Sequence, residues 1–326
     1  MGILLFMRVP LPAAITTTSI AVMVHLLTDV LIIRQRRHKG RCWLAAGALA
    51  LSLFGLGGCS LIETTYNQSP FLLQWWLDRQ LDLDSQQKHQ LKGDLRILLA
   101  WHRQTQLPQV VQSVQGLIDI APNDLTPAQT CAFQNEVWQS LPVLAQQAGG
   151  VLARTALSLR GEQILHLRQY LEEDNIKWRE EWLDGNEEDR LQRRLKRSLE
   201  RVEDYYGSLD SGQKNLLRET LRRSPYQPAI AWQERQRRQR DMIDTLERIR
   251  LGQPELKMAQ AELGELIVRM FNPPVETHRS HVQANAQALC AATSRVHNAM
   301  RPEQRQRALN KLKQQQQALA RLLQAP

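Results

Sequence analysis

The chain has 326 residues, and its 42 Lys and Arg against 33 Asp and Glu give a formal net charge of +9. Residues 1–58 hold six of the basic residues and one acidic residue, which leaves 36 basic and 32 acidic residues in 59–326. Charges that are so nearly balanced exert no strong attraction on nucleic acid, so we expect no nucleic-acid partner.

The first predicted element is an export signal in residues 1–58. A basic cluster at 34–41 precedes an uncharged apolar run at 43–54, and two glycines, the second being Gly58, precede Cys59. This order is typical of a secretory signal peptide. The apolar run is shorter than the roughly 20 residues of a transmembrane helix. We therefore predict cleavage between Gly58 and Cys59.

The four residues Leu56-Gly-Gly-Cys59 resemble the lipobox that lipoprotein signal peptidase recognises. The resemblance implies that the thiol of Cys59 accepts a lipid, so that palmitate and related acyl chains anchor the protein in a membrane. Ser60 follows, whereas the usual inner-membrane retention residue at that position is Asp, so we expect the outer membrane, with the protein facing the periplasm. The alternative is an ordinary buried cysteine after a cut elsewhere.

An apolar stretch at 11–33 precedes this signal and is interrupted only by His25 and Asp29. It is long enough to span a bilayer, in which case it would insert with its N-terminus outward. The simpler interpretation is that translation begins further downstream, at Val30 or Leu31.

Residues 59–69 are expected to form a lipidated tether, and 70–326 a helical periplasmic domain. Gln, Leu, Arg and Ala dominate this domain, and no stretch alternates with a period of two. Turns or kinks are expected at Asn123, Gly149-Gly150, Asp184-Gly185, Gly207, Pro225, Pro254 and Pro273-Pro274. The predicted helices are 70–80, 85–106, 108–120, 127–157, 161–183, 188–206, 210–222, 229–251, 255–271, 276–299 and 302–323. The predicted fold class is all-α, an elongated multi-helix bundle.

Five expected helix starts share an apolar residue four positions before a glutamine. They are Leu83-Asp-Ser-Gln-Gln87, Leu125-Thr-Pro-Ala-Gln129, Leu159-Arg-Gly-Glu-Gln163, Leu209-Asp-Ser-Gly-Gln213 and Met300-Arg-Pro-Glu-Gln304. Three of them have Asp or Thr at the N-cap and Gln at the third helical position, which is the pattern of a capping box. The copies at Arg160 and Arg301 lack a capping residue. Five ordinary helix starts account for most of the pattern.

Two further resemblances rest on these residues. Residues 66–108, which include Trp75-Trp76-Leu77-Asp78 and Trp101-His102-Arg103, resemble an uncharacterised family of proteobacterial all-helical lipoproteins. This resemblance runs along the mature chain and implies location and fold but no activity. The Leu125-Thr-Pro-Ala-Gln129 pattern is similar to the LTxxQ motif of small periplasmic stress chaperones and sensors, which are much shorter proteins.

Several residues are candidates for a site. Trp75, Trp76, Trp101, His102 and Arg103 either form an aromatic groove for a peptide or lipid chain, or fill the core where two helices cross. Cys131 and Cys290 remain after Cys42 leaves with the signal and Cys59 is lipidated. In an oxidising compartment they either form a disulfide or are two separate buried cysteines.

Two further groups of residues are interpreted as ordinary surface features rather than as sites. His278 and His281 lie three apart on a predicted helix, with His297 further along, but no acidic companion completes a metal site, so we interpret them as surface histidines. The basic run at 235–240 either lies against an anionic surface or is the solvated face of its helix, and we favour the solvated face.

The leading hypothesis is an envelope lipoprotein with a structural, interaction or chaperone-like role in the periplasm, and not an enzyme. Its partners would be the membrane, through the lipid anchor, and protein clients or other envelope components. The alternative is a membrane-apposed binder of an anionic envelope component through the basic helix. A peptidoglycan-active enzyme comes third, because no nucleophile elbow, phosphate loop or dinucleotide fingerprint appears. We expect no catalytic residues, metal or cofactor.

Overall fold

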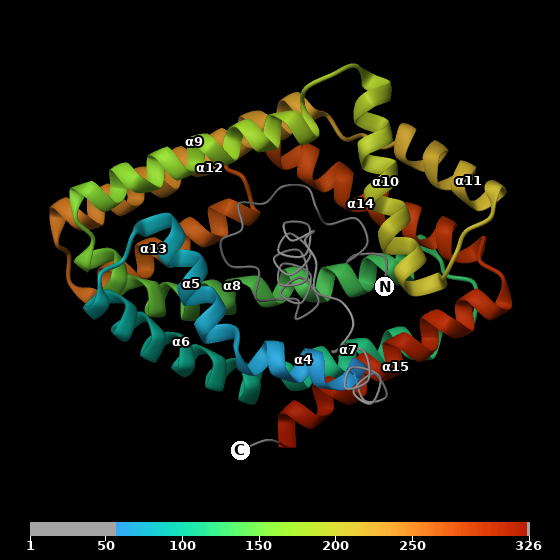
Figure 1. Ribbon diagram of the computed structural model, residues 1–326, viewed down its shortest axis with the longest axis horizontal. Helices are drawn as coiled ribbons and strands as arrows, with labels where there is room; N and C mark the ends of the chain where they lie inside the picture. The colour runs from blue at the N-terminus through green and yellow to red at the C-terminus, as the bar shows by residue number, and fades with distance from the viewer. Residues whose placement is uncertain (1–56, 325–326) are drawn as a thin grey trace, which may run out of the picture.

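The computed structural model describes residues 57–324, so nearly all of the signal peptide predicted in 1–58 lies outside the described residues. The described part is all-α, as predicted, with 12 helices and no strand (Figure 1). The helices are α4 (Gly57–Asn67), α5 (Ser69–Leu81), α6 (Ser85–Thr105), α7 (Leu107–Ile120), α8 (Pro127–Ser158), α9 (Gly161–Trp182), α10 (Glu187–Tyr206), α11 (Ser211–Arg222), α12 (Pro228–Gly252), α13 (Leu256–Phe271), α14 (Glu276–Asn298) and α15 (Pro302–Gln324). All eleven helices predicted between 70 and 323 are present, with ends within one residue of the prediction.

Local side-chain chemistry explains where many of these helices begin. Asp84, Thr126 and Asp210 each accept a hydrogen bond from the backbone N–H three residues on, and the glutamine at that position bonds back. Each capping box provides hydrogen-bond acceptors for two backbone N–H groups that have no partner within the first turn of the helix. At the two weaker starts, a glutamine bonds back to the backbone N–H of Arg160 or Arg301.

Two of these boxes meet across the fold. Gln87, at the α5–α6 corner, donates from Nε2 to the carbonyl oxygen of Ser158 at 2.8 Å and to Oε1 of Gln163 at 3.2 Å. Gln163, at the α8–α9 corner, donates in return to the carbonyl oxygen of Asp82 and to Oε1 of Gln87, both at 2.8 Å. The two side chains therefore join corners that lie 76 residues apart in the chain.

The same arrangement recurs where the α10–α11 and α14–α15 corners meet. Gln213 and Gln304 exchange hydrogen bonds of 2.7 and 3.2 Å, and each also donates to a backbone carbonyl of the opposite corner. In both places the arginine of the weaker start pairs with the aspartate that caps the other, Arg160 with Asp84 at 2.8 Å and Arg301 with Asp210 at 2.7 Å. The two pairs of corners that these glutamines join lie at opposite edges of the molecule (Figure 1).

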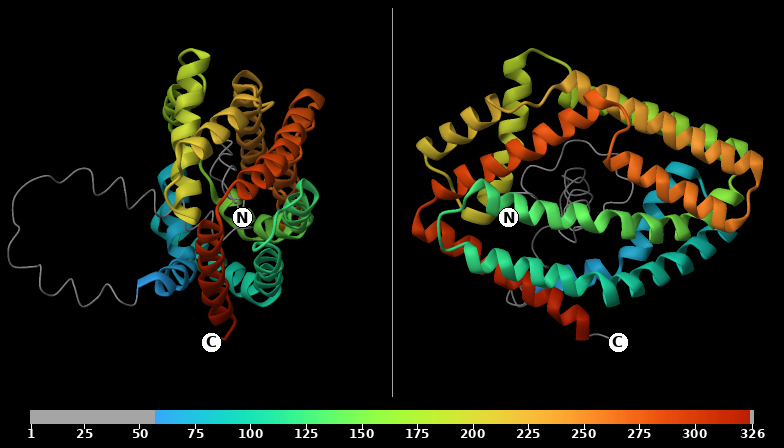
Figure 2. Two further views of the ribbon diagram at one scale, coloured as in Figure 1. Left: turned by 90° about the vertical axis from the view of Figure 1, so that its right-hand side faces the viewer. Right: turned by 180° about the vertical axis from the view of Figure 1, so that it is seen from behind.

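The helices follow a broad outline between these edges. Helices α9 and α12 run side by side along one long side, α6, α7 and α15 run along the other, and α8 passes through the middle (Figures 1 and 2). Buried apolar residues form a core at each end: Leu91 and Ile164 belong to one, and Val202 and Leu217 to the other. Each glutamine pair thus joins two turns at one end of the molecule, next to the core at that end.

Helix α8 packs closely against α13 at small residues. A Cβ atom added to Gly149 would lie 2.7 Å from the carbonyl oxygen of Gln260 and 2.9 Å from the backbone nitrogen of Gly264. We expected Gly149 and Gly150 to mark a turn or kink, but α8 runs unbroken through them. The missing side chain of Gly149 instead allows two helix backbones to approach each other.

The N-terminal helix α4 belongs to the folded body. The sequence suggests a tether at 59–69, but Thr65 and Tyr66 are buried, and Tyr66 packs with Leu107, Leu319 and Leu322. Helix α4 therefore lies against α15, the last helix. The folded body begins within the segment predicted as a tether, because the large side chain of Tyr66 fills a buried site between helices from both ends of the chain.

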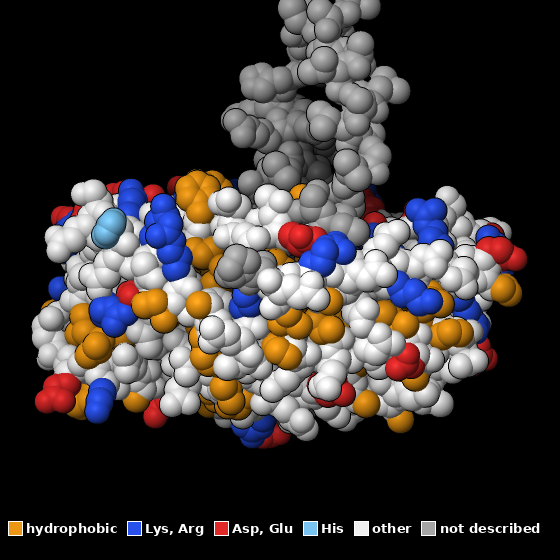
Figure 3. All heavy atoms as spheres, turned by 90° about the horizontal axis from the view of Figure 1, so that it is seen from below, with side chains coloured by type: hydrophobic (Ala, Val, Ile, Leu, Met, Phe, Trp, Pro, Cys, Tyr) orange, Lys and Arg blue, Asp and Glu red, His pale blue; other side chains and the backbone are white. Residues whose placement is uncertain are grey.

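The surface carries charges of both signs. On the face seen from below, Lys and Arg alternate with Asp and Glu, and hydrophobic side chains lie among them (Figure 3). Within residues 57–324, no helix is both long and apolar enough to cross a membrane.

Candidate binding cavity

The tryptophans of the aromatic cluster predicted from the sequence differ in their surroundings. Trp75 is 38% exposed on α5, with the guanidinium carbon of Arg79 5.3 Å from the centre of its ring. Trp101, on α6, packs against the core that contains Leu91 and Ile164. Trp76 is half-buried on α5. The structure thus separates the exposed Trp75 from Trp101, which contributes to a core.

His102 and Arg103 face α4 rather than an open site. The Nδ1 atom of buried His102 lies 2.9 Å from the hydroxyl oxygen of Tyr66. Arg103 donates to Oδ1 of Asn67 at 2.6 Å, and its guanidinium carbon lies 5.6 Å from the centre of the Tyr66 ring. Both side chains hold α4 on α6. Cys59, the predicted lipidation site, lies in the first turn of α4.

Two arginines of the basic run at 235–240 are turned inward, which corrects the solvated face that we expected, although Arg240 at its end is exposed. Arg235 and Arg238 are each only 4% exposed. Arg235 pairs with Asp174 of α9 at 2.6 Å, and Arg238 pairs with Glu234 at 2.6 Å. A helical pattern shows which residues share a face, but it does not show that the neighbouring helix supplies a carboxylate to that face.

Glu234 is the centre of a buried charge network. It accepts hydrogen bonds from Arg237 at 2.8 Å, from Arg238 at 2.6 Å and from Nδ1 of His278 at 2.7 Å. Burial acts to raise the pKa of the Glu234 carboxyl, but the bonds from Arg237 and Arg238 outweigh it and hold that pKa below its ordinary value. A carboxylate held in its charged form by two arginines is suited to joining helices rather than to accepting a proton.

The three histidines interpreted as surface residues are buried, and that interpretation was wrong. His278 and His281 are 8% exposed and His297 only 1%. The Nε2 atom of His281 accepts the backbone N–H of Gln227 at 2.9 Å, and His297 lies between the Tyr206 hydroxyl and the Asn123 carbonyl, both at 2.9 Å. Their partners are on distant segments, so the helix alone gives no sign of burial. No cluster of potential metal ligands occurs among the described residues.

A cavity of about 310 Å³ lies between α8, α10, α11, α12 and α14. Its volume is at the lower end of the range of about 300–1,000 Å³ that is usual for small-molecule sites. The lining includes large apolar side chains, arginines and one histidine, among them Trp138, Trp182, Tyr226, Phe271, Arg194, Arg197, Arg223, Arg238, His281 and Arg295.

Aromatic side chains from four elements form part of the cavity wall. The rings of Trp182, at the end of α9, and Tyr226, between α11 and α12, are 6.4 Å apart at their centres. Trp138 of α8 and Phe271 of α13 form a second pair at 6.1 Å. Both pairs meet edge to face, the geometry that the charge distribution of aromatic rings favours. These walls offer apolar contact to a ligand.

Two arginines of α10 stack on one of these aromatic pairs. The guanidinium carbon of Arg194 lies 4.9 Å from the Tyr226 ring centre, and that of Arg197 lies 5.0 Å from the Trp182 ring centre. Burial lowers the pKa of the Arg194 guanidinium and raises the pKa of the Tyr226 hydroxyl to about 12. The guanidinium groups of Arg194 and Arg197 are thus held against the aromatic wall of the cavity and are partly removed from water.

The charge of the cavity lining is one-sided. Its residues include six arginines and no Asp or Glu. Arg197 is paired with Glu181 at 2.6 Å, and Arg238 with Glu234. For Arg194, Arg223 and Arg295, no carboxylate of the described residues lies within 4.0 Å; these arginines give the cavity an excess of positive charge.

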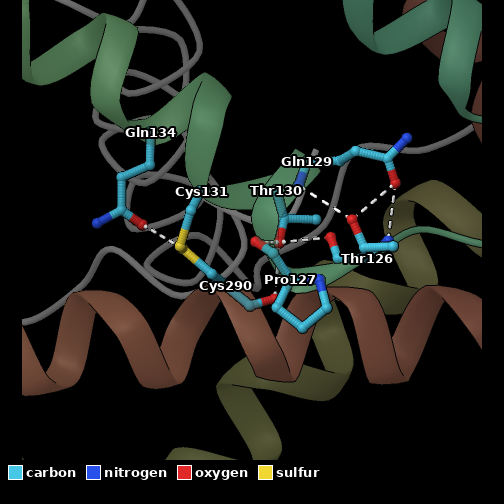
Figure 4. The surroundings of a disulfide bond; sticks show 7 residues. All are labelled: Thr126, Pro127, Gln129, Thr130, Cys131, Gln134 and Cys290. Carbon is cyan, nitrogen blue, oxygen red and sulfur yellow. Dashed lines mark hydrogen bonds between the residues drawn. A yellow bond between two sulfur atoms is a disulfide. The ribbon is translucent and has the colours of Figure 1, made fainter.

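A disulfide joins two walls of the cavity. Cys131 of α8 and Cys290 of α14 are bonded, with their Cα atoms 5.2 Å apart although 159 residues separate them in the chain (Figure 4). Beside it, the Thr130 hydroxyl donates to the carbonyl oxygen of Cys290 at 2.8 Å, and Gln134, a lining residue, lies 3.3 Å from the Cys290 sulfur. The covalent link therefore fixes α8 relative to α14 at the cavity.

Of the lining residues, the sequence analysis singled out His281 and, within the basic run, Arg238, but it missed the aromatic side chains. Trp138, Trp182, Tyr226 and Phe271 are separated by up to 133 positions, and no local motif connects them. The one available signal is that Trp182 and Tyr226 lie next to turns, where large aromatic residues are unusual unless they contact another part of the fold.

Comparison with known proteins gives a family but no function. The model of a family of unknown function, DUF6279, matches residues 79–267, which is more than half of the chain. No curated protein and no solved structure matches it.

Proposed function

The chain belongs to the DUF6279 family of unknown function, and we propose that it is a lipid-anchored binding protein of the bacterial envelope, with no catalytic role. The observation that carries the binding role is the cavity, in which aromatic walls surround arginines that lack a carboxylate partner. Such a combination of apolar walls and a few convergent polar groups is what ligand sites commonly present.

The charge network beside the cavity supports binding rather than catalysis. The carboxylate of Glu234 has its hydrogen-bonding capacity taken up by Arg237, Arg238 and His278, and its pKa is lowered rather than raised. A general acid or base that works near neutral pH needs a pKa near that pH. Glu234 and its partners therefore serve to position helices beside the cavity.

Anchoring rests on the Leu56-Gly-Gly-Cys59 pattern and is consistent with the position of α4. With a lipid on Cys59, the buried Tyr66 would follow seven residues later, so the body would be held close to the membrane. Outer-membrane sorting, with the body in the periplasm, follows from Ser60 as an expectation. An interaction or chaperone-like role is compatible with this placement, with protein clients or envelope components as partners.

The alternative of a membrane-apposed binder through the basic helix is less well supported. Arg235 and Arg238 are buried and paired, so they present no basic surface to lipid head groups. Within the cavity lining, Arg194, Arg223 and Arg295 have no carboxylate of the described residues within 4.0 Å, so they are the arginines that we propose for an anion.

Photo-crosslinking in intact cells tests the binding role. A photoreactive phenylalanine derivative replaces Trp182, which lines the cavity, and in a control it replaces Leu165, which is 61% exposed on the same helix. We expect a reproducible adduct from position 182 and none from position 165. Equal labelling at both positions, or no adduct at position 182, would contradict a cavity-centred binding role.

A further inference from the structure

Building on the proposed function, we infer that the cavity binds an anionic amphiphile, with the acidic head group at Arg194 and Arg223 and the hydrocarbon portion against Trp138 and Phe271. The shared chemistry is a phosphate or comparable acidic group attached to an alkyl chain.

The charge distribution selects an anion. Arg197 and Arg238 are already paired with Glu181 and Glu234, so they need no further partner. Arg194 is different, because it is half-buried, its guanidinium carbon lies 4.9 Å from the Tyr226 ring centre, and no carboxylate of the described residues lies within 4.0 Å of it. A cation removed from water without a carboxylate is unfavourable, and an incoming anion relieves that cost through charge-assisted hydrogen bonds.

The walls select an apolar chain beside that anion. Trp138 and Phe271 come from α8 and α13, whereas the arginines that stack on Trp182 and Tyr226 come from α10. Most of the lining residues of α14 are small or apolar, including Val282, Ala286, Leu289 and Ala292. A purely ionic ligand such as free phosphate would leave these walls against water, whereas a hydrocarbon chain would remove their apolar surface from water, which is favourable.

The volume limits the occupant. A cavity of about 310 Å³ admits a head group with part of one chain, but it does not admit a folded domain. The disulfide between Cys131 and Cys290 fixes two of the walls, so the cavity does not depend on a ligand to bring α8 and α14 together.

Binding to the full chain in an uncharged maltoside detergent tests the inference. The titrants are dodecyl phosphate, dodecyltrimethylammonium and inorganic phosphate, and the readouts are tryptophan fluorescence, to which Trp138 and Trp182 contribute, and the shift in Tm. We expect saturable binding of dodecyl phosphate, with weaker binding of the other two. Equal binding of the ammonium compound would overturn the assignment of an anionic head group, and equal binding of inorganic phosphate would overturn the role of the apolar walls.

Variants locate the site. Arg194→Gln and Arg223→Gln should each weaken dodecyl phosphate binding by about tenfold or more, because each removes a charge-assisted hydrogen bond. Arg240→Gln is the matched control, since Arg240 is exposed on α12 and does not line the cavity. Arg223 is itself exposed, so its variant is a valid test even if Arg194→Gln folds poorly. The inference would be refuted by a combination of two results. Arg223→Gln would bind dodecyl phosphate with unchanged affinity, and Arg194→Gln would either bind it with unchanged affinity or fail to fold.

The two tests fail in distinguishable ways. An adduct at position 182 without dodecyl phosphate binding would leave the binding role intact and remove only the ligand class. Absence of both would remove the proposed function as well.

Discussion

The contact between α8 and α13 can be tested with two adjacent glycines that should respond in opposite directions. Both Gly149 and Gly150 lie inside α8, where alanine is intrinsically more favourable than glycine by about 0.5–1 kcal/mol. A Cβ at Gly150 would meet only the Gln260 side-chain amide, at 3.8 Å, which is an ordinary contact. Gly150→Ala should therefore raise the free energy of unfolding by about 0.5–1 kcal/mol.

At Gly149 the same methyl group would lie 2.7 Å from the Gln260 carbonyl oxygen and 2.9 Å from the Gly264 nitrogen. Both are backbone atoms, so α13 as a whole must shift. Overpacking of a tight core commonly costs about 1–3 kcal/mol, and the rigid neighbours place Gly149→Ala in the upper part of that range. After the gain in helix propensity, we expect a net loss of about 1–2 kcal/mol.

Urea unfolding followed by circular dichroism measures both variants. The midpoint should move down for Gly149→Ala and up for Gly150→Ala, with the slope of the free energy against urea unchanged. Shifts of the same sign in the two variants would refute the close approach of α8 and α13, because only that approach distinguishes the two positions.

Three further predictions concern the anchor, the disulfide and a buried histidine. Cys59→Ala should abolish labelling with a palmitate analogue and leave unprocessed precursor; undiminished labelling, or fractionation of the wild type with inner-membrane markers, would contradict the anchor or its sorting. Replacing Cys131 and Cys290 together by serine should lower the free energy of unfolding by about 2–5 kcal/mol in a urea titration, and two freely alkylated thiols in protein taken from cells would contradict the bond. Burial holds the pKa of His297 below its ordinary value of 6.5, so the unfolded chain binds the proton more readily and stability should fall as pH drops below 6.5. Unfolding midpoints between pH 7 and about 5 check this, and an equally steep fall in His297→Gln would assign the effect to other groups.

The positions of the helices were predictable because the signals that start and end them are local. Asp84 and Gln87 sit three residues apart and form their capping box within one turn, and Pro127 starts α8 where its missing N–H needs no partner. Helix α4 was missed, since its short sequence has neither a capping box nor a proline. Tyr66 of this helix is buried against Leu319 and Leu322 of α15, about 250 residues later in the chain.

The cavity could not be predicted for a related reason. Whether an arginine is solvated or buried depends on the helix opposite, and Arg235 is buried because Asp174 of α9 meets it. The pairing of Gln87 with Gln163 likewise uses two ordinary helix starts whose proximity the sequence does not reveal. The sequence pattern identified these residues as caps, and the tertiary structure adds their second set of hydrogen bonds.

The packing of α4 against α15 has a consequence for the order of folding. If the chain is exported with its N-terminus first, as proposed, the segment next to the anchor emerges early, but the site for Tyr66 is completed only by Leu319 and Leu322 near the end of the chain. Contacts at such large sequence separation form slowly, because the intervening chain must first be brought together. The membrane-proximal end of the body would thus be the last part to close, and a chain cut short before α15 would reach the membrane with that end open.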